Sequence, residues 1–176
     1  MDLKLKEKNV VVSGSTEGIG LGIAISFLKE GSNVCITSSS KIKHKNIKNK
    51  LTKEYVDNKI LSFNCDFTKK NEIEKLHKNI LSKWKKIDIL ICNVGSGEGT
   101  QEAIPSEADW DKSWRINFNS SLFAAQVFKK NLIKNKGNII FISSIAGIES
   151  IGAPVEYSVA KSSLIALTKN MAHKLD

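Results

Sequence analysis

The feature that most constrains the fold is a regular alternation of short apolar runs with segments in which apolar residues recur every three or four positions. The strand-length runs cover residues 10–12, 33–37, 60–64, 87–93 and 138–143. Strands that alternate with helical segments are typical of parallel strands joined by crossover helices. The sequence therefore predicts an α/β fold, with a doubly wound parallel sheet between two layers of helices.

The helices are predicted from apolar residues that share one face. In the first helix, Ile19, Ile23 and Phe27 form this face, with Ala24 and Leu28 beside them, and Gly31 ends the helix. Further helices are expected over residues 41–57, 73–84, 106–134 and from residue 154 onward. The middle of the fifth strand is aliphatic or Phe throughout, which predicts a strand that is buried on both faces.

Length and composition indicate one soluble domain over residues 1–176, because 41% of the residues are hydrophobic and 26% are charged. No apolar run reaches the roughly 20 residues that a membrane span needs, and the first residues lack the apolar core of a signal peptide. Cys35, Cys65 and Cys92 lie far apart and form no metal-binding or redox spacing. We therefore expect reduced thiols, no metal, no membrane partner and a cytoplasmic location.

The net charge of +9 raises the possibility of a nucleic-acid partner. However, Arg115 is the only arginine among the 27 basic residues. The bidentate fork that recognises guanine and phosphate is therefore almost absent, and we expect no nucleic-acid binding. The densest basic segment, residues 41–53, suits either a solvated helix face or an anionic ligand.

A glycine-rich turn follows the first strand and leads directly into the first helix. Gly14, Gly18 and Gly20 form a G-x-x-x-G-x-G pattern. Glycines allow a ligand to approach the backbone closely, and the free N–H groups of a helix N-terminus favour a pyrophosphate. The pattern predicts a dinucleotide site; the alternative is an ordinary glycine-rich turn.

A second candidate site lies near the other end of the chain, where Tyr157 follows Ser144 by thirteen positions and Lys161 follows Tyr157 by four. Residues four apart meet on one helix face, and a nearby ammonium favours the phenolate that can act as a base. Alternatively, the pair is an exposed helix pair. Tyr55 and Lys59 have the same spacing but no matching serine, so they serve as an internal control.

In this order, these motifs resemble the short-chain dehydrogenase/reductase family, in its ordinary single-domain branch. The segment from Ser13 to Gly20 is similar to the family's TGxxxGIG loop, with Ser in place of Thr. Residues 92–95 resemble its NNAG motif, while Asp66 and Asn117 match its adenine-side Asp and its active-site Asn. The resemblance implies a Rossmann-like fold and cofactor contacts from Gly14, Ser15, Thr16, Gly18, Ile19, Gly20, Ser39, Ser40, Lys41, Asp66, Asn93, Gly95, Tyr157 and Lys161.

The resemblance also implies an NAD(P)-dependent transfer of hydride between nicotinamide and a carbonyl or secondary alcohol substrate. Tyr157 would be the general acid/base, and Lys161 would bind the nicotinamide ribose and favour the Tyr157 phenolate. Ser144 would orient the substrate oxygen, and Asn117 would hold a water molecule that links Lys161 to solvent. The long helix and the final helix imply a homo-oligomer, a dimer or tetramer, at full length.

Two departures from the family pattern bear on these expectations. After the second strand there is no acidic residue for the ribose hydroxyls, whereas Ser39, Ser40 and Lys41 suit a 2′-phosphate. We therefore expect NADP to be preferred, with NAD possible, although the usual Arg is missing and Glu17 occupies a position that is often basic. The second departure is that the family's C-terminal strands are missing, which suggests a C-terminally truncated enzyme. A catalytically silent dinucleotide-binding or scaffold protein is therefore the alternative.

Overall fold

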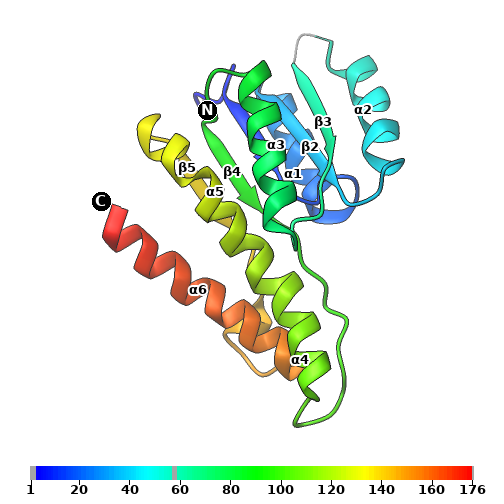
Figure 1. The fold of residues 1–176 in the computed structure, drawn as a ribbon. Coiled ribbons are helices and arrows are strands. Elements are labelled where there is room, and N and C mark those ends of the chain that lie inside the picture. Colours follow the sequence, from blue (N-terminus) through cyan, green and yellow to red (C-terminus); the bar gives the residue numbers. More distant parts are fainter. Residues whose placement is uncertain (1–2, 57–58, 176) are drawn as a thin grey trace.

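The computed structural model describes residues 3–56 and 59–175 and contains a parallel sheet flanked by helices (Figure 1). The strands run in the spatial order β3-β2-β1-β4-β5, and every neighbouring pair is parallel. Their bounds are β1 Asn9–Val12, β2 Asn33–Ser38, β3 Ile60–Asn64, β4 Ile89–Cys92 and β5 Asn138–Phe141. The doubly wound parallel sheet predicted from the sequence is confirmed.

Helices fill the connections between the strands in the order that the periodicity predicts. They are α1 Gly18–Lys29, α2 Lys43–Glu54, α3 Lys70–Lys83, α4 Glu107–Trp114, α5 Ser120–Lys134 and α6 Val155–Leu175. Ser106 caps α4, because its Oγ accepts a hydrogen bond from the Asp109 N–H at 3.2 Å. The second helix ends at Glu54, and its expected end near residue 57 lies outside the described residues.

The long helix expected over residues 106–134 is continuous but not uniform. A π-helical segment, Arg115–Asn119, joins α4 to α5. Each hydrogen bond of a π-helix spans one residue more than in an α-helix, and such segments often occur at functional sites. Asn117 is fully buried in the middle of this segment.

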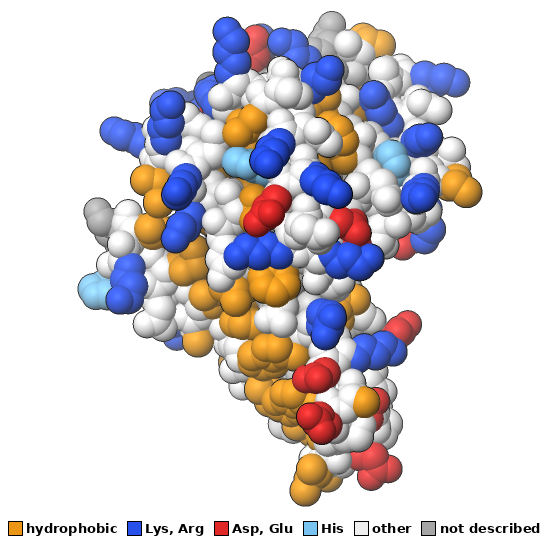
Figure 2. Space-filling model, viewed as in Figure 1, with side chains coloured by type: hydrophobic (Ala, Val, Ile, Leu, Met, Phe, Trp, Pro, Cys, Tyr) orange, Lys and Arg blue, Asp and Glu red, His pale blue; other side chains and the backbone are white. Residues whose placement is uncertain are grey.

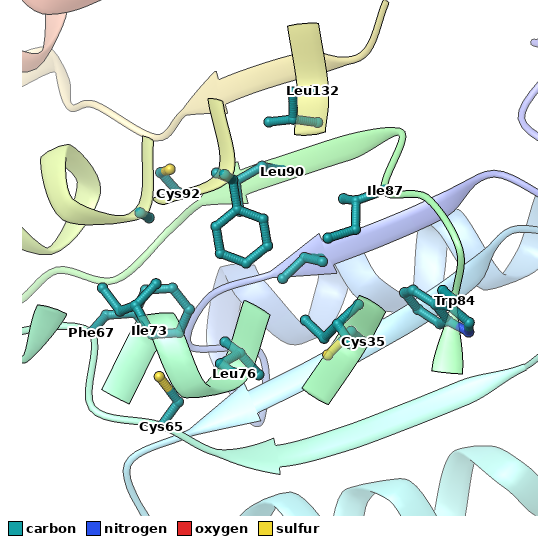
Figure 3. Close-up of a cluster of buried hydrophobic side chains, with 14 residues drawn as sticks. Cys35, Cys65, Phe67, Ile73, Leu76, Trp84, Ile87, Leu90, Cys92 and Leu132 are labelled. Carbon is teal, nitrogen blue, oxygen red and sulfur yellow. The ribbon is translucent and has the colours of Figure 1, made fainter. Parts of the chain in front are cut away.

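Alternate residues of the strands point to opposite faces of the sheet and make two separate cores. Val11, Cys35 and Leu90 pack with side chains of α3 and α5 in the cluster shown in Figure 3. Val10, Val12 and Ile36 pack with side chains of α1 and α2 on the other face. The three layers predicted from the sequence therefore follow from strands that are apolar on both faces.

The strand order places the change of direction between β1 and β4. From β1 the chain continues outward to β2 and β3, then returns to the other side of β1 for β4 and β5. In open α/β sheets, ligands bind at such a switch point, beyond the carboxyl ends of the strands. The glycine-rich turn follows β1, and residues 93–97 follow β4, so both candidate segments meet there.

The expected burial of the fifth strand is wrong. Ile140 is 45% exposed, and Asn138 is also exposed. Within the described residues β5 pairs with β4 alone, and α5 packs against it on one face. An edge strand with one covered face leaves every second side chain open to solvent.

The predicted apolar face of α1 is found in the structure except at its first residue. Ala24 and Leu28 are buried, and Ile23 and Phe27 are partly buried against the same core cluster. Ile19, in contrast, is 67% exposed, so that part of the prediction is wrong. No helix within residues 3–56 and 59–175 is long and apolar enough to cross a membrane.

Candidate active site

One cleft of about 530 Å³ lies along the carboxyl ends of the strands and brings the two candidate sites together. This volume lies within the range of small-molecule and cofactor pockets. Of the residues predicted from the sequence, the cleft is lined by Gly14, Thr16, Gly18, Ile19, Gly20, Ser39, Asp66, Asn93, Gly95, Tyr157 and Lys161. Residues more than 130 positions apart thus border a single space.

The glycine-rich loop needs glycine for two different reasons. Gly14 has a φ of +61°, a left-handed conformation that most residues adopt only with strain. At Gly20, a Cβ would lie 2.5 Å from Asn93 Nδ2 and closer still to the Gly14 carbonyl oxygen. Asn93 Nδ2 donates hydrogen bonds to the carbonyl oxygens of Ser13 and Gly14, at 3.1 and 3.0 Å. These contacts hold the start of α1 beside β4.

The helix N-terminus at this loop is open to an anion. Glu17, the residue before α1, makes no side-chain capping hydrogen bond to the helix. The first N–H groups of α1 and its dipole therefore remain free to bind a phosphate. Ser15 lies below the loop, fully buried, where its Oγ donates to the Val12 carbonyl and accepts from the Thr37 N–H. Its side chain holds the loop to the sheet.

The segment after β2 is only partly in the cleft. Ser38 and Ser39 line the cleft, whereas Ser40 Oγ accepts from the N–H groups of Ile42 and Lys43 at the start of α2. The Lys43 ammonium pairs with the Glu17 carboxylate at 2.9 Å, across the gap between this segment and the glycine-rich loop. Lys41 is exposed and is not among the lining residues.

Asp66 is held rigidly at the far end of the cleft. Its Oδ1 accepts from the Thr68 N–H at 2.9 Å and from the Thr68 hydroxyl at 2.7 Å, and Lys69 lies 3.3 Å from its Oδ2. Burial acts to raise the pKa of Asp66, but these hydrogen bonds and the lysine charge outweigh it and lower the pKa. The carboxylate therefore remains charged and presents a fixed acceptor.

Tyr157 and Lys161 lie together at the other end of the cleft, on the first turns of α6. The Lys161 ammonium is 5.8 Å from the centre of the Tyr157 ring and donates to the Ile142 carbonyl at 2.9 Å. Lys161 is only 4% exposed, and burial lowers its pKa. At Gly95, a Cβ would lie 2.9 Å from Lys161 Nζ, so glycine leaves room for the ammonium.

Asn117 and Ser144 flank this end of the cleft without lining it. Asn117 Oδ1 accepts from the Ser96 N–H at 2.9 Å, and its Nδ2 donates to Ser113 Oγ at 3.1 Å. The side chain of Asn117 therefore links the π-helical segment to the loop after β4. Ser144 Oγ accepts from the Ala146 N–H at 3.2 Å, at the start of a short 3₁₀ turn, Ile145–Gly147.

The control tyrosine lies elsewhere. Tyr55 is the residue that ends α2, and it does not line the cleft. Burial and the neighbouring Glu54 raise the pKa of the Tyr55 phenol, which is the opposite of what a general base requires. Identical spacing in sequence therefore leads to different surroundings for Tyr55 and Tyr157.

Two polar residues beside the site were missed by the sequence analysis. Ser113 is 4% exposed and accepts the hydrogen bond that orients Asn117. Glu156 is 1% exposed and accepts a hydrogen bond from the Thr100 N–H at 2.9 Å. Neither belongs to a short motif; the only available signal was that each lies within four residues of a predicted site residue.

A five-stranded parallel sheet with a glycine-rich turn after β1 defines a Rossmann-like α/β protein. A family model described as short chain dehydrogenase matches residues 8–176. The chain is 34% identical over 173 residues to a short-chain dehydrogenase/reductase of Arabidopsis thaliana, covering 98% of this chain and 67% of the plant protein. It is also 32% identical to a 3-oxoacyl-[acyl-carrier-protein] reductase of Rickettsia prowazekii, with 98% and 68% covered.

Solved structures agree with this assignment. A 7α-hydroxysteroid dehydrogenase complexed with NADH and 7-oxo glycochenodeoxycholic acid superposes with a TM-score of 0.90 at 27% identity, covering 99% of this chain and 68% of that chain. A structure of ElxO with NADP bound has a TM-score of 0.88 at 30% identity, with 96% and 68% covered. The chain therefore belongs to the short-chain dehydrogenase/reductase family of oxidoreductases, and it spans about two thirds of the length of these relatives.

Proposed function

We propose that this protein is an NAD(P)-dependent oxidoreductase that interconverts a carbonyl compound and a secondary alcohol. The observation that carries the proposal is that a single cleft contains the glycine-rich loop at the start of α1 and the Tyr157–Lys161 pair on α6. The helix N-terminus at the glycine-rich loop would hold the pyrophosphate of a dinucleotide in this cleft, and Tyr157 and Lys161 would lie on its nicotinamide side. The chain's membership in a family of dehydrogenases supports the same class of reaction.

When bound, the nicotinamide cofactor supplies or accepts the hydride. In carbonyl reduction, the Tyr157 hydroxyl donates the proton to the substrate oxygen, and Ser144 holds that oxygen by a hydrogen bond. The Lys161 ammonium stabilises the phenolate that remains and binds the nicotinamide ribose. Asn117, which is fixed by Ser96 and Ser113, holds a water molecule on the path from Lys161 to solvent.

NADPH should bind more tightly than NADH. Ser38 and Ser39 line the adenosine side of the cleft, no carboxylate follows β2 within residues 37–41, and the Lys43 ammonium lies nearby. Because the preference depends on exposed lysines, it should weaken at high salt. Fluorescence titrations of the protein with NADPH and with NADH, at low and at high salt, measure the two affinities and their ratio.

Glu17 opposes this preference by pairing with Lys43. Glu17→Gln should therefore tighten NADPH about twofold to fivefold, the scale of one exposed charge pair, and leave NADH nearly unchanged. Glu74→Gln, a change in an exposed carboxylate of α3, is the matched control. Tighter binding of NADH than of NADPH by the unmodified protein would reverse the assignment.

We also propose that two copies associate through α4, α5 and α6. Hydrophobic side chains gather over these helices (Figure 2), and an apolar groove of about 380 Å³ between α5 and α6 is lined by residues that include Leu122, Ala125, Leu167 and Met171. On the same stretch Trp114 stacks on Trp110 at 6.2 Å and meets Phe118 at 4.8 Å between ring centres. A two-fold axis would bury the same helices of both copies.

Sedimentation velocity should therefore show a dimer or a larger even-numbered assembly. Met171→Glu places a charge in the groove between α5 and α6 and should give a monomer with an unchanged circular dichroism spectrum. Lys78→Glu, on the exposed side of α3, should sediment as the unmodified protein does. A monomeric unmodified protein at micromolar concentration would contradict this association.

The compartment and the domain organisation are further parts of the proposal. Cys35, Cys65 and Cys92 are free and buried, which supports a reducing, cytoplasmic compartment. A single continuous sheet joins segments from both halves of the chain, which supports one cofactor-binding and catalytic domain over residues 1–176.

A further inference from the structure

Glu156 is a buried carboxylate directly before the proposed catalytic tyrosine. It lies in the first turn of α6 and is only 1% exposed. Burial of a charged carboxylate is costly unless hydrogen bonds compensate for it. An acidic residue in the first turn of a helix interacts favourably with the helix dipole even when it is exposed to solvent. This interaction therefore does not explain why Glu156 is buried.

The contact that buries Glu156 is made with the loop after β4. Its Oε1 accepts a hydrogen bond from the Thr100 backbone N–H at 2.9 Å. The preceding residue, Gly99, approaches so closely that a Cβ there would lie 2.6 Å from Pro154 Cβ and would overlap Glu156 Oε1. The backbone at residues 99–100 is thus packed directly against the start of α6.

The other end of the same short segment is also tied to a helix. The Ser96 N–H donates to Asn117 Oδ1 at 2.9 Å, so residues 96–100 are held between the π-helical segment and α6. Ser96 and Gly97 line the cleft on the Tyr157 side. The segment therefore forms part of the wall of the cleft that Tyr157 also lines, and two side chains from other elements accept hydrogen bonds from its backbone.

Within the described part of the chain, Glu156 Oε2 is buried and has no hydrogen-bond partner. Among residues 3–56 and 59–175 the carboxylate thus has one hydrogen bond, which its Oε1 accepts from the Thr100 N–H. A glutamate that served only to stabilise α6 would not need to accept a hydrogen bond from the backbone of Thr100. The geometry links Glu156 to the loop rather than to its own helix.

We propose that Glu156 is a positioning residue that holds residues 96–100 against α6 and so sets the wall of the substrate side of the cleft relative to Tyr157. The substrate part of this inference rests on the proposed oxidoreductase function. The contact itself does not, because it can be measured without turnover. A loosened segment should weaken substrate binding more than it slows the chemical step.

Hydrogen exchange of the peptide containing residues 96–105, followed by mass spectrometry, tests the contact. Glu156→Ala should speed exchange at the Thr100 amide about tenfold or more, because the N–H loses its hydrogen-bond acceptor. Glu156→Gln retains an acceptor oxygen and should restore protection to within about threefold of the unmodified protein. Glu74→Ala, which removes an exposed carboxylate of α3, should change nothing.

Kinetics on a panel of aliphatic and aromatic ketones test the role in substrate binding. Glu156→Ala should raise KM about tenfold with a smaller fall in kcat and with NADPH affinity unchanged, and Glu156→Gln should recover most of the KM. Two results would overturn the proposal. One is a Glu156→Ala protein in which the Thr100 amide exchanges at the same rate as in the unmodified protein. The other is a Glu156→Gln protein in which this amide exchanges as fast as in Glu156→Ala.

A second variant covers the case in which Glu156→Ala does not fold. Gly99→Ala keeps the glutamate at position 156, but the added Cβ would overlap Glu156 Oε1 and lie 2.6 Å from Pro154 Cβ. The variant therefore separates residues 99–100 from the start of α6 and should produce the same faster exchange at Thr100. Unchanged exchange in Gly99→Ala would overturn the contact. Faster exchange in a protein that reduces no ketone would support the contact while contradicting the oxidoreductase function, so the two proposals fail separately.

Discussion

Tyr157→Phe should lower the rate of ketone reduction about 10²- to 10⁴-fold and leave NADPH affinity unchanged. The substitution removes only the hydroxyl that exchanges the proton under the proposed function, and this range is the usual contribution of a general acid or base. The phenyl ring keeps its place beside the Lys161 ammonium, which lies 5.8 Å from the ring centre. Oxidation of NADPH, followed by its absorbance with the ketone panel, measures the rate, and fluorescence titration measures the affinity.

The chain contains its own control for this experiment. Tyr55→Phe changes the other tyrosine that precedes a lysine by four residues, but Tyr55 lies at the end of α2, away from the cleft. It should alter neither rate nor affinity. Normal turnover in Tyr157→Phe would contradict the assignment of Tyr157 as the general acid/base. If the unmodified protein binds NADPH but reduces none of the ketones, the result supports a dinucleotide-binding protein without catalytic activity.

Lys161→Met should weaken NADPH binding about tenfold to 100-fold while making the unbound protein more resistant to unfolding. The loss of affinity follows from the hydrogen bonds that the Lys161 ammonium would donate to the ribose under the proposed function, each of which contributes roughly 1.5–3 kcal/mol. The gain in stability follows from removing a charge that is 4% exposed and forms no ion pair within residues 3–56 and 59–175. Met retains most of the apolar volume of Lys.

Two opposing effects determine the stability of Lys161→Met. The Ile142 carbonyl loses the hydrogen bond that it accepts from Lys161 Nζ, at a cost of about 1–3 kcal/mol. Burial of a charge that forms no ion pair also costs free energy, and the substitution removes this cost. We expect the removed cost to exceed that of the lost hydrogen bond, so the free energy of unfolding should rise.

The pH dependence of unfolding checks the cause. Burial lowers the pKa of Lys161 in the folded protein below its ordinary value of 10.5. The folded state then binds fewer protons than the unfolded state between those two pKa values, and this contribution makes stability increase with pH across that window. Below the folded pKa the penalty is present in full. Lys161→Met should lack the alkaline increase; if it keeps the increase, burial of Lys161 does not destabilise the fold.

Structural features that depend on residues close together in the sequence were determined by the sequence alone. The alternation of strand and helix periods was sufficient for the parallel sheet, and the bounds of β3 agree with the expected residues 60–64. The glycines at 14, 18 and 20 and the four-residue step from Tyr157 to Lys161 were recognisable because loop conformation and helix faces depend on short spacings. These features located both ends of the cleft.

Burial and hydrogen-bond partners were decided by the tertiary structure, because they depend on residues that are distant in the sequence. The run at residues 138–143 has the composition of an interior strand, but β5 lies at the edge of the sheet that the described residues form, and Ile140 is half exposed there. A glutamate at a helix start is normally solvated, yet Glu156 is buried because the backbone of Thr100, 56 positions earlier, lies against it. Periodicity indicates which side chains share a face, whereas only the packed chain determines what that face meets.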